Sequence, residues 1–124
     1  MNATVLIADD EPNILISLEF LMKREGFTVL LARDGQEALE VLRRERPRLV
    51  LLDVMMPRKT GFEVCQEVRQ DDAIRDTRIL MLTAKGRETD VVKGLALGAD
   101  AYMTKPFSTR DLVAKVRELL GDAA

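Results

Sequence analysis

The sequence predicts an α/β fold in which helices cover both faces of a five-stranded parallel sheet. Two observations support this prediction. Short aliphatic runs alternate five times with amphipathic helical patterns along the 124 residues, and this alternation is typical of parallel strands joined by helical crossovers. The connections are short, and no repeat or low-complexity stretch interrupts them. Right-handed crossovers in a chain of this length favour a doubly wound sheet with strand order 2-1-3-4-5.

Four aliphatic runs and one short mixed run are the expected strands. Each run is bounded by polar or turn residues, as strands buried on both faces are. The third run is expected at the centre of the sheet, where it leads straight into Asp53 before the chain turns at Pro57. The expected strands are residues 5–8, 28–31, 49–52, 79–82 and 100–104.

Capping and stop signals mark the expected helices. Proline suits a first helical turn, Ser, Thr or Asp followed by Glu at the third position resembles a capping box, and glycine commonly ends a helix. The signals that open the helices are Pro12, Asp34 with Glu37, Thr60 with Glu63, the weaker Lys85-Gly86-Arg87, and Ser108 or Thr109. The signals that end them are Gly26, Arg46-Pro47, the polar connection 71–76, Gly98 and Gly121.

Composition excludes several classes of function. With 21 acidic and 19 basic residues, the chain lacks the basic excess of a nucleic-acid-binding surface. Neither a signal peptide nor a membrane span is present in the sequence, so we expect a cytoplasmic protein without a membrane partner. Histidine is absent, which excludes imidazole zinc sites, serine or cysteine triads that use histidine, and a phosphohistidine on this chain.

Cys65 is the only cysteine, so an intrachain disulfide or a cysteine metal cluster is excluded. It shares a helical spacing with Phe62 and Val68, which favours a buried structural thiol.

Polar side chains collect at one edge of the expected sheet. Because the carboxyl ends of parallel strands meet at one edge, Asp9, Asp10, Asp53, Thr83 and Lys105 should lie together there. Three neighbouring carboxylates repel one another unless a positive group lies among them. A hard divalent cation such as Mg²⁺ suits such a site, and it commonly shares its ligands with phosphate oxygens. One carboxylate would then be a nucleophile that accepts a phosphoryl group.

Five motifs at these strand ends carry a family resemblance. They are Asp9-Asp10, Asp53 with Met56-Pro57, Gly61, Thr83-Ala84 and Lys105-Pro106-Phe107. Together they resemble the receiver domain of bacterial two-component response regulators, from Val5 to Leu120. The resemblance implies a flavodoxin-like fold, a single receiver domain over residues 1–124 with its core in 4–120, and no output domain within these residues. Whether the chain is a stand-alone receiver or a fragment of a longer regulator stays open.

The resemblance also implies a role for each residue at this edge. Asp53 would be the phosphoacceptor, and Mg²⁺ or Mn²⁺ would be bound by Asp10, Asp53 and the backbone carbonyl of Met55. Asp9 would hold a metal-bound water.

Three further residues would respond to the phosphoryl group. Lys105 would pair with it, Thr83 would donate its hydroxyl to a phosphoryl oxygen, and Tyr102 would swing into the space that this movement leaves. Such a protein catalyses only its own phosphorylation and dephosphorylation. Met55 and Lys85, two residues after Asp53 and Thr83, look unable to orient an attacking water, so we expect slow self-dephosphorylation.

The partners implied by the resemblance lie outside the chain. The phosphoryl donor would be a sensor histidine kinase or a phosphotransfer protein, with small acyl phosphates as substitutes. The output face would comprise helix 4, strand 5 and helix 5. Residues 94–102 resemble receivers attached to winged-helix transcription factors, which dimerise through that face, although Ala101 departs from their pattern. Charged residues that could form ion pairs there are Lys93, Asp100, Asp111, Lys115 and Arg117.

Three alternative functions fit the sequence less well. A haloacid-dehalogenase-like phosphatase needs a second aspartate two residues after its nucleophile, where this chain has Met55. A flavin or dinucleotide module needs Gly, Ser or Thr after the first strand, whereas three acids there would repel a phosphate. An unphosphorylated receiver used as a binding scaffold is disfavoured by the complete set of five site residues.

Overall fold

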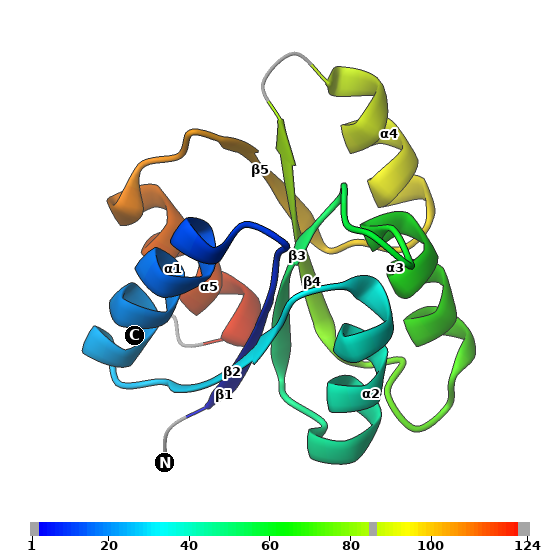
Figure 1. Cartoon of the computed structure of the whole chain (residues 1–124), viewed down its shortest axis with the longest axis horizontal. Helices are drawn as coiled ribbons and strands as arrows, with labels where there is room; N and C mark the ends of the chain where they lie inside the picture. Colours follow the sequence, from blue (N-terminus) through cyan, green and yellow to red (C-terminus); the bar gives the residue numbers. More distant parts are fainter. Residues whose placement is uncertain (1–2, 85–86, 122–124) are drawn as a thin grey trace.

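The computed structural model describes residues 3–84 and 87–121. Strands and helices alternate along these ranges (Figure 1). The strands are β1 (Thr4–Ala8), β2 (Thr28–Ala32), β3 (Leu49–Asp53), β4 (Arg78–Ala84) and β5 (Ala101–Lys105). The helices are α1 (Pro12–Arg24), α2 (Gly35–Glu45), α3 (Gly61–Gln70), α4 (Glu88–Ala96) and α5 (Thr109–Leu120). The expected helix opening at Lys85-Gly86 lies outside the described residues.

The sheet confirms the predicted topology. All pairings are parallel, and the strand order is β2-β1-β3-β4-β5. β3 lies at the centre, and all five of its residues are buried. Its aliphatic run is therefore explained by neighbours on both edges and helices on both faces.

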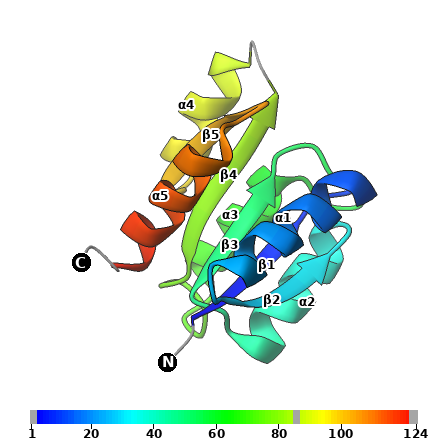
Figure 2. The ribbon, with the colours of Figure 1, turned by 90° about the vertical axis from the view of Figure 1, so that its left-hand side faces the viewer.

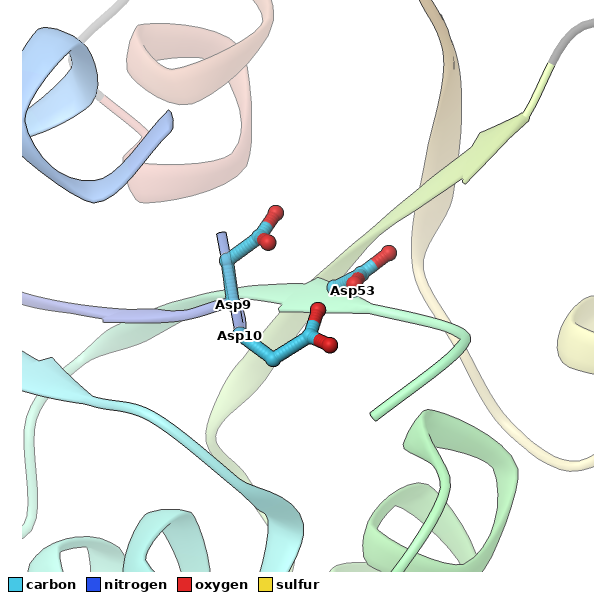
Figure 3. A group of neighbouring side chains, drawn as sticks. All are labelled: Asp9, Asp10 and Asp53. Carbon is cyan, nitrogen blue, oxygen red and sulfur yellow. The ribbon is translucent and has the colours of Figure 1, made fainter. Parts of the chain in front are cut away.

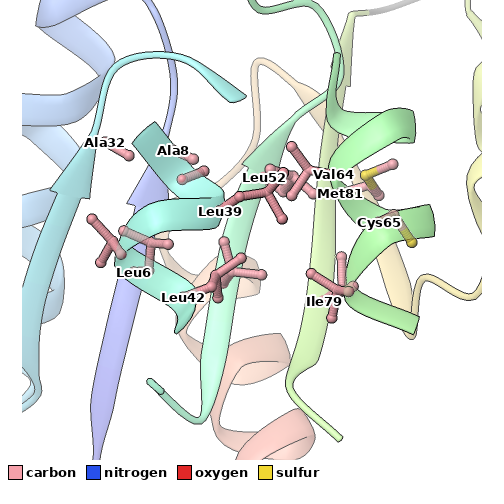
Figure 4. Close-up of a cluster of buried hydrophobic side chains, with 14 of the residues drawn as sticks. Leu6, Ala8, Ala32, Leu39, Leu42, Leu52, Val64, Cys65, Ile79 and Met81 are labelled. Carbon is pink, nitrogen blue, oxygen red and sulfur yellow. The ribbon is translucent and has the colours of Figure 1, made fainter. Parts of the chain in front are cut away.

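Helices cover both faces of the sheet. α1 and α5 pack on one face, while α2, α3 and α4 lie on the other (Figures 1 and 2). Successive strand residues point to opposite faces, so Leu51 joins the core under α1 and α5 and Leu52 joins the core under α2 and α3. Figure 4 shows Leu52 beside Leu39 of α2 and Val64 of α3. This packing places the carboxyl ends of the strands at one edge.

The predicted helix caps are confirmed in part. Thr60 and Glu63 form the complete capping box of α3. The side chain of Asp34 accepts a hydrogen bond from the amide of Glu37 at 2.8 Å, but the carboxylate of Glu37 accepts from the amide of Arg33 at 2.6 Å. The expected box on α2 is therefore wrong in its second bond. Ser108 caps α5, since its hydroxyl accepts from the amide of residue 111 at 3.2 Å.

The last strand begins one residue later than the sequence predicted. The side chain of Asp100 accepts a hydrogen bond from the amide of Ile79 at 2.7 Å and one from Arg69 at 2.9 Å. Asp100 therefore closes the turn before β5. The prediction for Cys65 is confirmed: it is fully buried, its thiol donates to the carbonyl of Leu97 at 3.6 Å, and burial raises its pKa.

Candidate functional site

Three aspartates gather at the carboxyl edge of the sheet (Figure 3). Asp9 and Asp10 directly follow β1, and Asp53 is the last residue of β3. Each offers a carboxylate oxygen, and these oxygens all lie within 4.8 Å of one another. Asp9 and Asp53 are buried, while Asp10 is exposed. The cluster thus consists of two buried acids and one that is exposed to solvent.

Lys105, at the end of β5, contacts two of these acids. Its Nζ lies 2.9 Å from Oδ2 of Asp9 and 3.3 Å from Oδ1 of Asp53. Glu11 approaches the same ammonium at 3.8 Å. One ammonium therefore faces several carboxylates, and the site keeps an excess of negative charge.

The pKa values of Asp53 and Lys105 reflect burial first and the neighbouring charges second. Burial, followed by the charge of Asp9, raises the pKa of Asp53 from 3.8 to about 7, although the charge and hydrogen bond of Lys105 oppose the rise. Burial by itself lowers the pKa of Lys105, but its hydrogen bond to Asp9 and the charges of Asp53 and Asp9 outweigh burial, so the net shift is upward. The carboxylates therefore suit a further positive group.

This donor set fits a hard divalent cation. Mg²⁺ prefers oxygen ligands and takes one or two carboxylates together with water. The clustered oxygens of Asp9, Asp10 and Asp53 provide such ligands, and Lys105 is a single positive charge beside three carboxylates. The carbonyl of Met55, two residues further on, lies in the loop that lines the same pocket.

Thr83 lies near the carboxyl end of β4, the strand next to the one that carries Asp53. It lies one residue beyond Leu82, which pairs with Asp53 across β3 and β4. The side chain is buried, and among the described residues its hydroxyl has no hydrogen-bond partner. A buried hydroxyl without a partner is costly, so Thr83 has a donor available for a group that arrives at Asp53.

Tyr102 lies on the same side of the sheet as Thr83. In the register of β4 and β5, Tyr102 pairs with Met81 and Thr104 pairs with Thr83, and residues two apart on a strand share a face. Tyr102 is 44% exposed and lines a surface pocket with Leu95. The structure thus shows an outward Tyr102, and its movement stays a prediction.

A pocket surrounds the acidic cluster, and sequence reasoning missed part of its rim. Apolar groups from four separate segments meet there because α1 begins, and β3, β4 and β5 end, at this edge. The lining residues are Asp10, Glu11, Ile14, Asp53, Val54, Met55, Ala84, Lys105 and Pro106. A larger cavity of about 620 Å³ lies at the opposite edge, lined by Arg48, Thr77 and Leu120 among others. None of the three clustered aspartates lines that cavity, so the smaller pocket is the candidate functional site.

Several charges expected to form ion pairs with a second copy are already engaged within the chain. Asp100 pairs with Arg69 at 2.9 Å and with Arg78 at 3.7 Å. Arg117 pairs with Glu25 at 3.0 Å. These partners come from distant elements, so no local pattern in the sequence indicated them.

The two lysines that were expected to form ion pairs with a second copy also have partners in the chain. The ammonium of Lys93 lies 4.6 Å from the centre of the Phe62 ring, and Lys115 pairs with Glu118 at 3.2 Å.

Across residues 3–84 and 87–121, no helix is both long and apolar enough to cross a membrane.

Comparisons with known proteins identify the family of the chain. A family model described as the response regulator receiver domain matches residues 5–117. The alkaline phosphatase synthesis transcriptional regulatory protein PhoP of Bacillus subtilis is 48% identical over 120 residues, which are 97% of this chain and 49% of PhoP. The chain therefore spans about half the length of this relative.

Solved structures show the same fold. A response regulator from Chloroflexus aurantiacus superposes with a TM-score of 0.94 at 34% identity, covering 98% of this chain and 99% of that one. The chemotaxis response regulator CheY4 of Vibrio cholerae gives 0.90 at 33%, covering 96% and 99%. The receiver domain of the sensor histidine kinase PA1611 of Pseudomonas aeruginosa, solved with magnesium in its active-site cleft, gives 0.90 at 26%, covering 98% and 99%. The chain belongs to the response regulator receiver domains of two-component systems.

Proposed function

We propose that the protein is a phosphoacceptor switch in which Asp53 receives a phosphoryl group in a Mg²⁺-dependent reaction. The observation that carries this proposal is the position of Asp53, a buried carboxylate that shares one edge with Asp9, Asp10 and Lys105. The magnesium in the cleft of the PA1611 receiver supports the choice of ion.

The residues at the acidic edge would have distinct roles in holding the ion. Asp10, Asp53 and the carbonyl of Met55 would hold the ion, and Asp9 would hold one of its waters. When bound, Mg²⁺ would offset the negative charge that develops on the transferring phosphoryl group. Since β3 and its neighbours are packed on both faces, the acceptor carboxylate is held in place before the donor arrives.

The transfer step is a displacement at phosphorus. An oxygen of Asp53 attacks the phosphorus of a phosphohistidine, the P–N bond breaks, and its electron pair leaves with the imidazole. Lys105 then exchanges its contact with the Asp53 carboxylate for one with a phosphoryl oxygen. The hydroxyl of Thr83 donates to a second phosphoryl oxygen, and Tyr102 moves inward.

The donor lies on another protein, because this chain has no histidine. We propose a sensor histidine kinase or phosphotransfer protein in this role. The chemistry of the chain itself is confined to accepting and losing the phosphoryl group.

The output face comprises α4, β5 and α5. It exposes the apolar side chains of Val92, Leu95 and Tyr102, which are 68%, 43% and 44% exposed. Since Asp100 and Arg117 have partners within the chain, apolar contacts rather than those charges would join this face to a second copy or an output partner. The transcriptional role named for PhoP supports an output that acts on transcription.

The phosphorylated state should be long-lived. Met55 is 57% exposed and lies at the rim of the site, where a thioether cannot orient water for attack on the acyl phosphate. A phosphoryl lifetime as short as that of chemotaxis-type receivers would contradict this proposal.

Intact mass after incubation with Mg²⁺ and acetyl phosphate tests the proposed function. We expect one phosphoryl adduct that requires Mg²⁺ and is absent in Asp53→Asn. The matched control is Asp72→Asn, which changes an exposed aspartate of the loop after α3 and should leave the adduct intact. An adduct that persists in Asp53→Asn would assign the acceptor to another residue.

A further inference from the structure

The loop between β3 and α3, residues 54–60, contains a strained turn. The amide of Lys59 donates to the carbonyl of Pro57 at 2.8 Å, and the residue between them, Arg58, has a φ of 69°. A hydrogen bond between residues two apart around a positive φ marks a γ-turn of the rare, strained form. Such a conformation persists only where the surrounding structure holds it.

The amino end of α2 contacts this turn. The amide of Gly35 donates to the carbonyl of Pro57 at 3.5 Å, and the carboxylate of Asp34 lies 3.6 Å from Nε of Arg58. A Cβ atom on Gly35 would lie only 2.6 Å from Cβ of Lys59 and 2.7 Å from its carbonyl carbon. The two backbones are therefore in direct contact, and only glycine fits between them.

The other end of the loop is anchored to the sheet and to α3. The amide of Val54 donates to the carbonyl of Leu82 at 3.0 Å, and the amide of Gly61 donates to the carbonyl of Val54 at 2.8 Å. Lys59 also pairs with Glu67 of α3 at 2.6 Å. The loop is thus held by α3 on one side and by α2 on the other, and the site lies directly before it at Asp53.

From this arrangement we propose that Gly35 is a positioning residue for the phosphorylation site. It touches neither the aspartates nor the phosphoryl group. Because Gly35 has no side chain, the start of α2 can contact the turn at 57–59 directly. This contact holds the loop that carries the Met55 carbonyl toward the aspartate cluster. The inference rests on the proposed metal site, and it adds a determinant of metal affinity on α2, a helix that carries none of the site residues.

Calorimetric titration with Mg²⁺ tests the proposal directly. A Cβ at position 35 pushes the turn away, so Gly35→Ala should weaken Mg²⁺ binding about tenfold, as the loss of supporting contacts around a metal site commonly does. Gly94→Ala is the matched control, because a Cβ at that helical glycine meets its nearest neighbour, the Cε of Met81, at an ordinary 3.4 Å. This control should bind Mg²⁺ as the native protein does.

Two further variants separate the backbone contact from its neighbours. Arg58→Gly removes the ion pair with Asp34 and the positive-φ strain but keeps the Gly35 contact, so its affinity should stay within about twofold of native. Lys59→Gly in the Gly35→Ala background removes the clash with Cβ of Lys59 and leaves the clash with its backbone carbonyl, so it should restore only part of the affinity. It also provides a second variant if Gly35→Ala alone does not fold.

Hydrogen exchange gives a readout that needs no metal. The amides of Lys59 and Gly61 should exchange faster in Gly35→Ala than in the native protein, while those of the central strand stay protected. Native affinity in Gly35→Ala, or an equal loss in Arg58→Gly, would overturn the positioning role alone. A native protein that does not bind millimolar Mg²⁺ would overturn the metal site itself, and the positioning role with it.

Discussion

The Nζ atom of Lys105 lies 3.3 Å from Oδ1 of Asp53, although their strands are not neighbours in the sheet. β4 lies between β3 and β5, and the lysine reaches across its carboxyl end to Asp53 and onward to Asp9 of the first strand. One long side chain thus connects three strands of the sheet at the acidic site. Its removal leaves the acceptor without its counter-charge.

Lys105→Met should slow phosphorylation by acetyl phosphate about 100-fold, the usual scale for removing a group that stabilises developing charge. Binding of Mg²⁺ should persist, because the three aspartates remain and a competing cation is gone. The rate of adduct formation by intact mass, together with a Mg²⁺ titration, measures both effects. Lys115→Met, on the surface of α5, is the control and should phosphorylate normally; a Lys105→Met rate close to native would contradict the role of the lysine.

Stability should depend on pH through Asp53. Its pKa is about 7 in the folded protein against 3.8 for an ordinary aspartate, so between these values the folded state binds more protons than the unfolded state. The free energy of unfolding of the metal-free protein should therefore fall as pH rises from about 4 to 7. One pKa unit corresponds to about 1.4 kcal/mol, so the total effect is on the order of a few kcal/mol.

Urea unfolding of the native protein and Asp53→Asn isolates this effect. The native protein should lose stability relative to the variant across that window, and Mg²⁺ should stabilise the native protein more at about pH 8 than at about pH 5, because only the ionised carboxylate binds it. Equal pH dependence in the two proteins would show that Asp53 is not the titrating group.

Local patterns predicted the strands, and the topology typical of doubly wound sheets then supplied the strand order and the edge where the cluster lies. Aliphatic runs that end in Asp9 and Asp53 identify buried strands and, through parallel topology, the edge where their carboxyl ends meet. Each step depends on residues that are adjacent in sequence. The start of β5 was wrong by one residue because the partners of Asp100, at Arg69 and Ile79, are 31 and 21 residues away.

The role of Gly35 was also beyond the sequence. In sequence it belongs to the helix-opening signal at Asp34, whereas its close contact is with Lys59, on a loop 24 residues further along. The same reason explains why the ion pairs of the charged residues on the output face were not predicted. Arg117, for example, pairs with Glu25, which is far from it in the sequence. Contacts between distant segments depend on helix placement, which periodicity alone does not specify.

Arg69→Ala should destabilise the protein by about 2–3 kcal/mol. The guanidinium donates to the carbonyls of Arg75 and Thr77 at 2.7 Å each and of Gly98 at 2.9 Å, and it pairs with Asp100 at 2.9 Å. It thereby joins the end of α3 to the loop before β4 and the turn before β5, and its loss takes the donor away from two partly buried carbonyls, those of Thr77 and Gly98.

Urea denaturation measures this change, with Arg44→Ala as the control. Arg44 is 66% exposed, and within the described part of the chain its one ion pair is with its neighbour Glu45, so its loss should cost less than about 0.5 kcal/mol. Equal unfolding midpoints for the two variants would remove Arg69 from its structural role.

Thr83→Val should stabilise the unphosphorylated protein and abolish its response to phosphorylation. Valine has nearly the shape of threonine and removes a buried hydroxyl that has no partner among the described residues, a gain of about 1–2 kcal/mol. The variant should still form the phosphoryl adduct, because Asp53 and Lys105 are intact. Without a donor on β4, however, phosphorylation should no longer change hydrogen exchange in α4 and β5. Thr83→Ser keeps the hydroxyl and should keep the response; a Thr83→Val protein that responds as the native one does would show that the signal leaves Asp53 by another route.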